Sequence, residues 1–246
     1  MGQIRVRGLE KSFGDVDALA GLSFDVEGGE LYGFLGPNGA GKTTTIRILT
    51  GQLTPDAGSV EVDGTDPTTE PIETRRRVGI LPEDGAPPSF FTPREYFRYV
   101  SRIRDLDAET VADRTSAWAD RLGYRGKLDT LHTDLSRGQQ QKVMITQAFL
   151  HEPEVVFIDE PLANLDPLVQ ERVKSFLRGY VEDGNAVFVS THNIDVAEEL
   201  CSRVGIVADG RLVAERVLDG TTGSLLEVFL AEVDAADPRD VPAMGR

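Results

Sequence analysis

The residues with the strongest chemical signature run from Gly36 to Thr43 and match G-x-x-x-x-G-K-S/T at each fixed position. Glycines let consecutive backbone N–H groups point inward around an anion, and a following helix aims its positive end at the same point. We expect Lys42 to reach the β- and γ-phosphates of a nucleotide, Thr43 to bind Mg²⁺ and Thr44 to add a phosphate hydrogen bond. The predicted nucleotide-binding residues of this loop are Gly36, Pro37, Asn38, Gly39, Ala40, Gly41, Lys42, Thr43 and Thr44.

Two further groups of polar residues follow apolar runs. Asp159 and Glu160 end the run that begins at Glu154, and His192 follows residues 186–190. We expect Asp159 to help hold Mg²⁺ and Glu160 to act as the general base that polarises a water for attack on a γ-phosphate. A lone histidine is more often structural, but at the end of a strand His192 could hydrogen-bond a γ-phosphate. Lys42, Glu160 and His192 are therefore the candidate catalytic residues.

Two weaker signals are compatible with nucleotide binding. Ser136 and Gln139 form a capping box, which predicts a helix start with Gly138 in its first turn. Such a start can bind an anion, although capping alone is the more probable role when this segment is taken by itself. Phe13, which precedes the glycine loop, could stack on adenine, and a place in the apolar core is nearly as probable.

The predicted elements place these residues at the ends of strands. Strands are expected at 3–8, 18–26, 30–35, 59–64, 78–82, 154–159 and 186–190, with a hairpin at 203–213. Helices are expected at 44–50, 94–104, 108–122, 140–150, 167–181, 195–201 and 224–233. The alternation predicts an α/β fold with a mostly parallel central sheet, a small antiparallel β subdomain and a helical insertion at about 84–151. We expect residues 1–246 to form a single domain with a short tail at about 234–246.

Composition narrows the class of protein further. The net charge of −15 argues against a nucleic-acid groove, which requires a basic face. Only five of the 26 basic residues are lysine, and an acidic, lysine-poor surface predicts a halophilic source. No apolar run approaches the roughly 18 residues of a membrane-spanning helix. With no visible secretory signal and with Cys201 as the one cysteine, we expect a cytoplasmic protein without internal disulfides.

The order of these motifs resembles the ATP-binding subunits of ATP-binding cassette (ABC) transporters, over roughly residues 3–215. The matching motifs are the phosphate loop, a signature at Leu135–Gln139, a Walker B strand at Val155–Glu160, a D-loop at Ala163–Pro167 and a switch histidine at His192. The resemblance implies a P-loop NTPase fold that uses ATP and Mg²⁺. It also implies that two cassettes pair head to tail, so that Ser136, Gly138, Gln139 and Asp166 of one copy complete the nucleotide site of the other.

Two residues depart from the family pattern. Arg137 replaces the first of the two glycines in the signature, while the phosphate-facing Ser136 and Gly138 remain. Glu83 occupies the position of the Q-loop glutamine, and we expect it to bind Mg²⁺ or its water through an oxygen atom. An arginine at the second helical position could favour an anion, so we do not interpret Arg137 as a sign of an inactive site.

The resemblance extends to partners and location. Residues 81–83 and 225–230 look most like the branch that serves type-2 permeases, which are often exporters. We therefore expect a separate membrane permease, a second copy of this chain or a paralogous cassette, and a position on the inner face of the cell membrane. Residues 90–93 are hypothesised to line a groove for a short permease helix, the alternative being ordinary packing. A soluble ABC-type ATPase in cofactor assembly or complex remodelling would share every catalytic residue, and only its partner would distinguish it.

Overall fold

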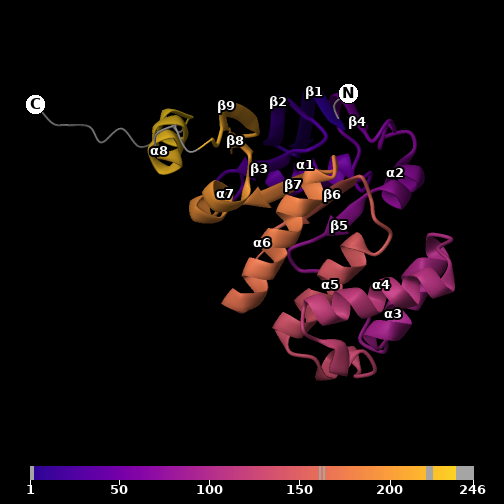
Figure 1. The fold of residues 1–246 in the computed structure, drawn as a ribbon. Coiled ribbons are helices and arrows are strands. Elements are labelled where there is room, and N and C mark those ends of the chain that lie inside the picture. Colours follow the sequence, from indigo (N-terminus) through magenta and orange to yellow (C-terminus); the bar gives the residue numbers. More distant parts are fainter. Residues whose placement is uncertain (1–2, 161, 163, 220–223, 237–246) are drawn as a thin grey trace, which may run out of the picture.

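The computed structural model describes residues 3–160, 162, 164–219 and 224–236 (Figure 1). The strands are β1 (Ile4–Phe13), β2 (Val16–Val26), β3 (Leu31–Leu35), β4 (Ala57–Val62), β5 (Gly79–Leu81), β6 (Val155–Asp159), β7 (Ala186–Thr191), β8 (Arg203–Ala208) and β9 (Arg211–Val217). The α-helices are α1 (Lys42–Leu49), α2 (Pro71–Arg77), α3 (Pro93–Ile103), α4 (Ala108–Arg121), α5 (Arg137–Phe149), α6 (Pro167–Glu182), α7 (Ile194–Leu200) and α8 (Leu225–Ala236). Of the predicted tail, residues 237–246 lie outside the described part of the chain.

The strands form two sheets, as predicted. The larger has the order β5-β6-β7-β3-β8-β9, in which only β9 pairs antiparallel to its neighbour. Every residue of β3, β6 and β7 is buried, because helices and the second sheet cover the two faces of the larger sheet. The smaller sheet has the order β2-β1-β4 and is antiparallel.

The register of the larger sheet brings the predicted motifs to one edge. Strand β7 lies between β3 and β6, so that Leu35 pairs with Thr191 and Asp159 pairs with Ser190. Strand β5 lies beside β6, with Leu81 opposite Ile158. Because parallel strands end at the same edge of a sheet, the segments that follow β3, β5, β6 and β7 emerge next to one another.

A cluster of aromatic rings fills the space between the two sheets. The fully buried ring of Phe188 has its centroid 5.2 to 5.8 Å from the rings of Phe24, Tyr32, Phe34 and Phe157. Strands β2, β3, β6 and β7 each contribute to this cluster, so the hydrophobic effect holds the small sheet against the strand that leads into the phosphate loop.

The helical insertion gathers at the end of the molecule opposite the small sheet (Figure 1). Its helices start at side-chain caps: Thr92 and Ser136 form capping boxes on α3 and α5, and Asp107 caps α4. None of the described helices has the length and apolar character that crossing a lipid bilayer requires.

Two local predictions were wrong. The first strand was predicted at 3–8, but β1 continues to Phe13, and Asp56 pairs there with Lys11 and accepts a hydrogen bond from the Ser12 N–H. Helix α2 was not predicted. Its sequence, PIETRRR, offers one large apolar residue and therefore no helical periodicity, and Thr74 is its only buried residue.

The aromatic cluster gives a prediction about stability. Phe188→Ala removes the ring that touches four others, and we expect the free energy of unfolding to fall by about 3–5 kcal/mol. Phe90→Ala is the matched control, because its side chain is 72% exposed, and we expect a change within about 0.5 kcal/mol. Denaturant unfolding of both variants measures the difference, and equal losses would contradict the assignment of Phe188 to the core.

Candidate functional site

The phosphate loop joins β3 to α1 in the predicted manner. Gly41 lies directly before α1 with φ of 98°, a left-handed conformation that glycine adopts without strain. A Cβ atom at Gly41 would also lie 2.5 Å from the Ala18 carbonyl oxygen. Glycine is therefore required here both by backbone conformation and by space, and the backbone N–H groups at the start of α1 remain available to an anion.

Lys42 lies back along the loop. Its Nζ donates to the carbonyl oxygens of Gly36, at 2.7 Å, and Pro37, at 3.0 Å. Burial lowers the pKa of this amine, while the carboxylates of Glu160, Asp159 and Glu83 act in the opposite direction. The ammonium group thus lies among acidic side chains, where nucleotide phosphates could replace the two loop carbonyls as its partners.

Acidic oxygens are concentrated opposite the lysine. Burial raises the pKa of Asp159, and the charge of Glu160 adds to the shift, while the nearby Ser190 hydroxyl and the charge of Lys42 oppose it. Burial also raises the pKa of Glu83, and the charges of Asp159, Asp84 and Glu160 add to this effect. Burial is the largest cause of both shifts, and the repulsion between these carboxylates is a further cause that a bound cation would relieve.

The oxygen donors of Thr43, Asp159 and Glu83 fit Mg²⁺, which prefers hard oxygen ligands. Among the described residues, no three His, Cys, Asp or Glu side chains are grouped so that they could hold a metal ion by themselves. Mg²⁺ is usually bound in proteins by one or two carboxylates together with substrate phosphates and water. The assignment of these three residues stays a prediction.

Glu160 is held by the end of the neighbouring strand. Its backbone has φ of 53°, and its N–H donates to the Ser190 carbonyl at 2.9 Å. One carboxylate oxygen accepts from the Thr191 hydroxyl at 2.9 Å. The other accepts from the His192 backbone N–H at 3.0 Å and lies 2.6 Å from His192 Nδ1. The structure therefore brings the predicted base and the predicted switch histidine into direct contact.

A cavity of about 250 Å³ collects most of the predicted residues. Those that line it are Asn38, Gly39, Gly41, Lys42, Thr43, Thr44, Glu83, Asp159, Glu160 and His192. Gly36, Pro37 and Ala40 shape the loop behind it, since the first two accept from Lys42 and Ala40 is buried. Ala18 also lines the cavity and was not predicted, because an alanine in a strand gives no chemical signal. Thr191, which donates to Glu160, was likewise not predicted, although its position directly before His192 at the end of a strand could have indicated it.

Phe13 lies at the end of β1, outside the group that lines the cavity. Its ring is 51% exposed and its centroid lies 5.7 Å from Lys11 Nζ. The alternative of a core position is therefore wrong for this residue, while adenine stacking stays a prediction.

The signature residues form a separate surface. Ser136 caps α5, Arg137 is the first helical residue, and the residues that line the 250 Å³ cavity include none of Ser136, Gly138, Gln139 and Asp166. A Cβ at Gly138 would lie 2.8 Å from the Asn164 carbonyl, so the signature and the D-loop are in close contact. Asp166 caps α6 and pairs with Lys142 of α5 at 3.6 Å. Ala163 of the predicted D-loop lies outside the described residues.

The fold and the phosphate site together define a P-loop ATPase cassette, and comparisons with known proteins identify its family. The family profile described as "ABC transporter" matches residues 19–163. The Nod factor export ATP-binding protein I of Burkholderia orbicola (strain AU 1054) is 34% identical over 236 residues, covering 96% of this chain and 77% of that protein. The daunorubicin resistance ATP-binding protein DrrA3 of Streptomyces coeruleorubidus is 34% identical over 233 residues, covering 93% of this chain and 74% of that protein.

A solved structure of the ATP-binding subunit of an ABC transporter has a TM-score of 0.88 and 28% identity, and the match covers 94% of this chain and 99% of that one. The chain therefore belongs to the ABC transporter family. It is an ATP-binding subunit of that family and an ATPase, which confirms the resemblance predicted from its motifs.

The phosphate site gives a prediction about Lys42. Lys42→Ala removes the one ammonium group that lines the cavity, and we expect Mg-dependent ATP hydrolysis to fall by at least about 100-fold, with weaker nucleotide binding. Lys127→Ala, at an exposed lysine of the helical insertion, is the matched control and should hydrolyse ATP at the unaltered rate. Phosphate release and binding of a fluorescent ATP analogue measure the two effects. Hydrolysis by Lys42→Ala at the rate of the unaltered chain would show that the lysine of this loop is not required for the reaction.

Proposed function

We propose that two cassettes enclose ATP between them and drive a separate membrane permease, with export as the direction of transport. One observation carries the proposal of a pair. The phosphate cavity contains the loop, the acids and His192, whereas Ser136 and Gly138 lie on another surface of the same chain. Each copy therefore presents two incomplete half-sites, and head-to-tail pairing joins the first half of one copy to the second half of the other.

In this pair the phosphates of ATP accept hydrogen bonds from Lys42 and from the backbone N–H groups at the start of α1. The start of α5, with the Ser136 hydroxyl and the Arg137 charge, approaches the γ-phosphate from the second copy. Thr43, Asp159 and Glu83 would hold Mg²⁺, which would supply positive charge beside the phosphates of the nucleotide. Glu160 accepts a proton from the attacking water, and His192 orients the γ-phosphate. Hydrolysis removes the γ-phosphate that joined the two surfaces, so the copies separate.

An exposed aromatic cluster near the start of α3 is the proposed contact surface for the membrane permease. Phe90 is 72% exposed and its ring centroid lies 4.7 Å from that of Phe91, which lies 5.5 Å from that of Tyr99. Exposed apolar patches commonly mark protein contacts, and this one supports the hypothesised groove for a permease helix. The export and resistance proteins among the relatives support export as the direction.

The pairing model gives a prediction about Glu160. Glu160→Gln keeps the size and most hydrogen bonds of the side chain but removes the base, so we expect hydrolysis to fall by at least about 100-fold while ATP still binds. The γ-phosphate then persists, and a dimer should accumulate in ATP but not in ADP. Light scattering during size-exclusion chromatography measures the mass.

The control tests the second half-site separately. Ser136→Asp retains a good helix cap but places a negative charge where the γ-phosphate of the second copy should lie. The double variant Glu160→Gln/Ser136→Asp should bind ATP and stay monomeric. A dimer of the double variant, or a monomer of Glu160→Gln at saturating ATP, would contradict head-to-tail pairing.

The permease interface gives a separate prediction. Replacing Phe90 and Phe91 by alanine should abolish transport in membranes that contain the permease, while ATP binding by the purified chain is retained. Ile72→Ala, at another exposed apolar side chain, should leave transport unaltered. Normal transport by the double alanine variant, at equal expression, would exclude this cluster as the coupling surface.

A further inference from the structure

One side of α3 combines exposed apolar side chains with arginines. Phe97, Val100 and Ser101 are buried and face the rest of the helical insertion, where α3 contacts α4 and α5. Because an α-helix has about 3.6 residues per turn, the positions three, four, seven and eight residues after Glu95 share the opposite side. The exposed residues at these positions form the α3 surface and are Arg98, Tyr99, Arg102 and Ile103.

The apolar part of the α3 surface continues the exposed aromatic cluster of Phe90, Phe91 and Tyr99. Tyr99 belongs to both, is 50% exposed and has its ring centroid 5.5 Å from that of Phe91. Ile103 is 53% exposed and lies one helical turn beyond Tyr99. A partner that covers the cluster and extends along α3 therefore removes both side chains from water, which is favourable.

The two arginines of the α3 surface have no partner among the described residues. Neither Arg98 nor Arg102 forms an ion pair or donates a side-chain hydrogen bond there. Arg94, the third arginine of α3, pairs with Asp129 at 2.7 Å. Glu95 is the only acidic residue of the helix, and its carboxylate accepts hydrogen bonds from the N–H and hydroxyl of the residue that caps α3. The α3 surface is therefore positive, on a chain whose net charge is −15.

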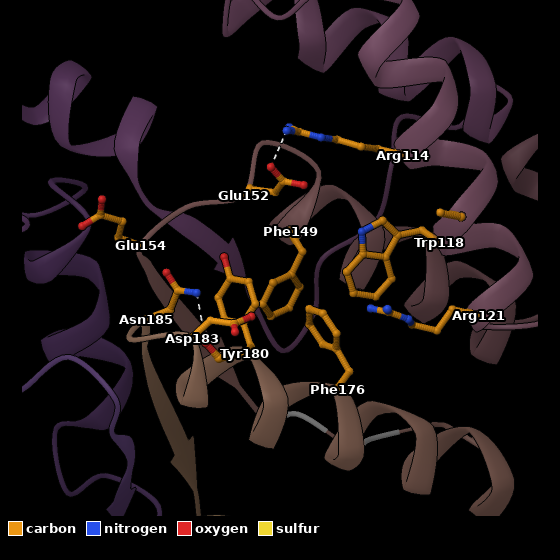
Figure 2. Close-up of a pocket in the computed structure, with 11 residues that line it drawn as sticks. Arg114, Trp118, Arg121, Phe149, Glu152, Glu154, Phe176, Tyr180, Asp183 and Asn185 are labelled. Carbon is orange, nitrogen blue, oxygen red and sulfur yellow. Dashed lines mark hydrogen bonds and ion pairs between the residues drawn. The ribbon is translucent and has the colours of Figure 1, made fainter.

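The arginines of the neighbouring helix α4 are engaged within the molecule. Figure 2 shows Arg114 and Arg121 at a cavity between α4 and α6. Arg114 forms an ion pair with Glu152, and the Arg121 guanidinium lies 4.6 Å from the Phe176 ring centroid. These two charges serve contacts inside the chain, whereas those of the α3 surface remain available to a partner.

The charge of the α3 surface distinguishes between the two partners available at a membrane. Cytoplasmic loops of membrane proteins carry an excess of Lys and Arg, which would repel Arg98 and Arg102. The cytoplasmic leaflet instead presents anionic headgroups, and phosphate groups match the planar fork of a guanidinium group. Tyrosine side chains also favour the level of the headgroups. Lipid therefore suits the α3 surface better than a permease loop does.

We propose that the α3 surface lies on anionic lipid headgroups of the cytoplasmic leaflet, beside the permease contact. This rests on the proposed function, because a membrane permease brings α3 close to the bilayer. Arg98 and Arg102 donate hydrogen bonds to lipid phosphates, while Tyr99 and Ile103 enter the headgroup layer. The same headgroups repel the acidic remainder of the chain, so the contact has a single orientation.

The test measures binding of the purified chain to sucrose-loaded vesicles by sedimentation. One set of vesicles contains equal parts of phosphatidylglycerol and phosphatidylcholine, and the other contains phosphatidylcholine alone. In about 0.1 M salt we expect binding to the anionic vesicles to be at least about tenfold tighter. Raising the salt to about 1 M, where the Debye length is about 3 Å, should remove most of this preference. No permease is present, so the result is independent of pairing and transport.

A double variant tests the two arginines. Arg98→Gln/Arg102→Gln should bind the anionic vesicles at least about tenfold more weakly than the unaltered chain. Arg47→Gln/Arg211→Gln makes the same change in net charge at exposed positions outside the insertion, and its affinity should stay within about twofold of the unaltered value. Circular dichroism and thermal unfolding in the same buffer check that all three proteins fold alike.

Three results would overturn the lipid contact. They are equal binding to the two kinds of vesicle, equal losses in the two double variants, and unaltered vesicle binding by Arg98→Gln/Arg102→Gln together with a loss of transport. The last result would assign the arginines to the permease. Normal transport by the alanine variant of Phe90 and Phe91 would instead count against the permease contact, and it would leave the vesicle result untouched.

Discussion

The parallel register of β3, β7 and β6 is the constraint on which the site depends. Each strand is followed by one part of the chemistry: the glycine loop after β3, His192 after β7 and Glu160 after β6. These parts are far apart in sequence, and the backbone hydrogen bonds of the parallel strands place them at one edge. The Phe188 cluster packs the same strands against the small sheet, so core packing supports the strand arrangement that sets the geometry at the edge.

Electrostatics explains why the site suits both a cation and an anion. Asp159, Glu160 and Glu83 surround one ammonium group, and the pKa of both Asp159 and Glu83 is raised. A nucleotide would supply negative charge to the Lys42 ammonium group, and a divalent ion bound with it would supply positive charge to the carboxylates. Glu83 presents a carboxylate at this cavity and, unlike a glutamine, cannot donate an amide hydrogen bond.

The sequence was sufficient to predict motifs whose residues are close together along the chain. It was insufficient to predict contacts between segments that are far apart in the chain. The phosphate loop, the acidic pair after β6 and the α5 cap were predictable because residue type and spacing define each. The order of the strands was not, because nothing in the sequence of β7 shows that it lies between β3 and β6. Helix α2 lacks apolar periodicity, and the contact of Trp118 with Phe176 joins α4 to α6, between which the chain forms α5 and β6. The contact of His192 with Glu160 likewise required the register of the sheet.

The hydrogen bonds to Glu160 tie its carboxylate to the end of β7. Its two carboxylate oxygens accept from the Thr191 hydroxyl and the His192 backbone N–H, and one lies against the His192 ring. A shift of Thr191 or His192 would therefore move the carboxylate with it. The position of the candidate general base is thus coupled to the conformation of the segment that ends β7.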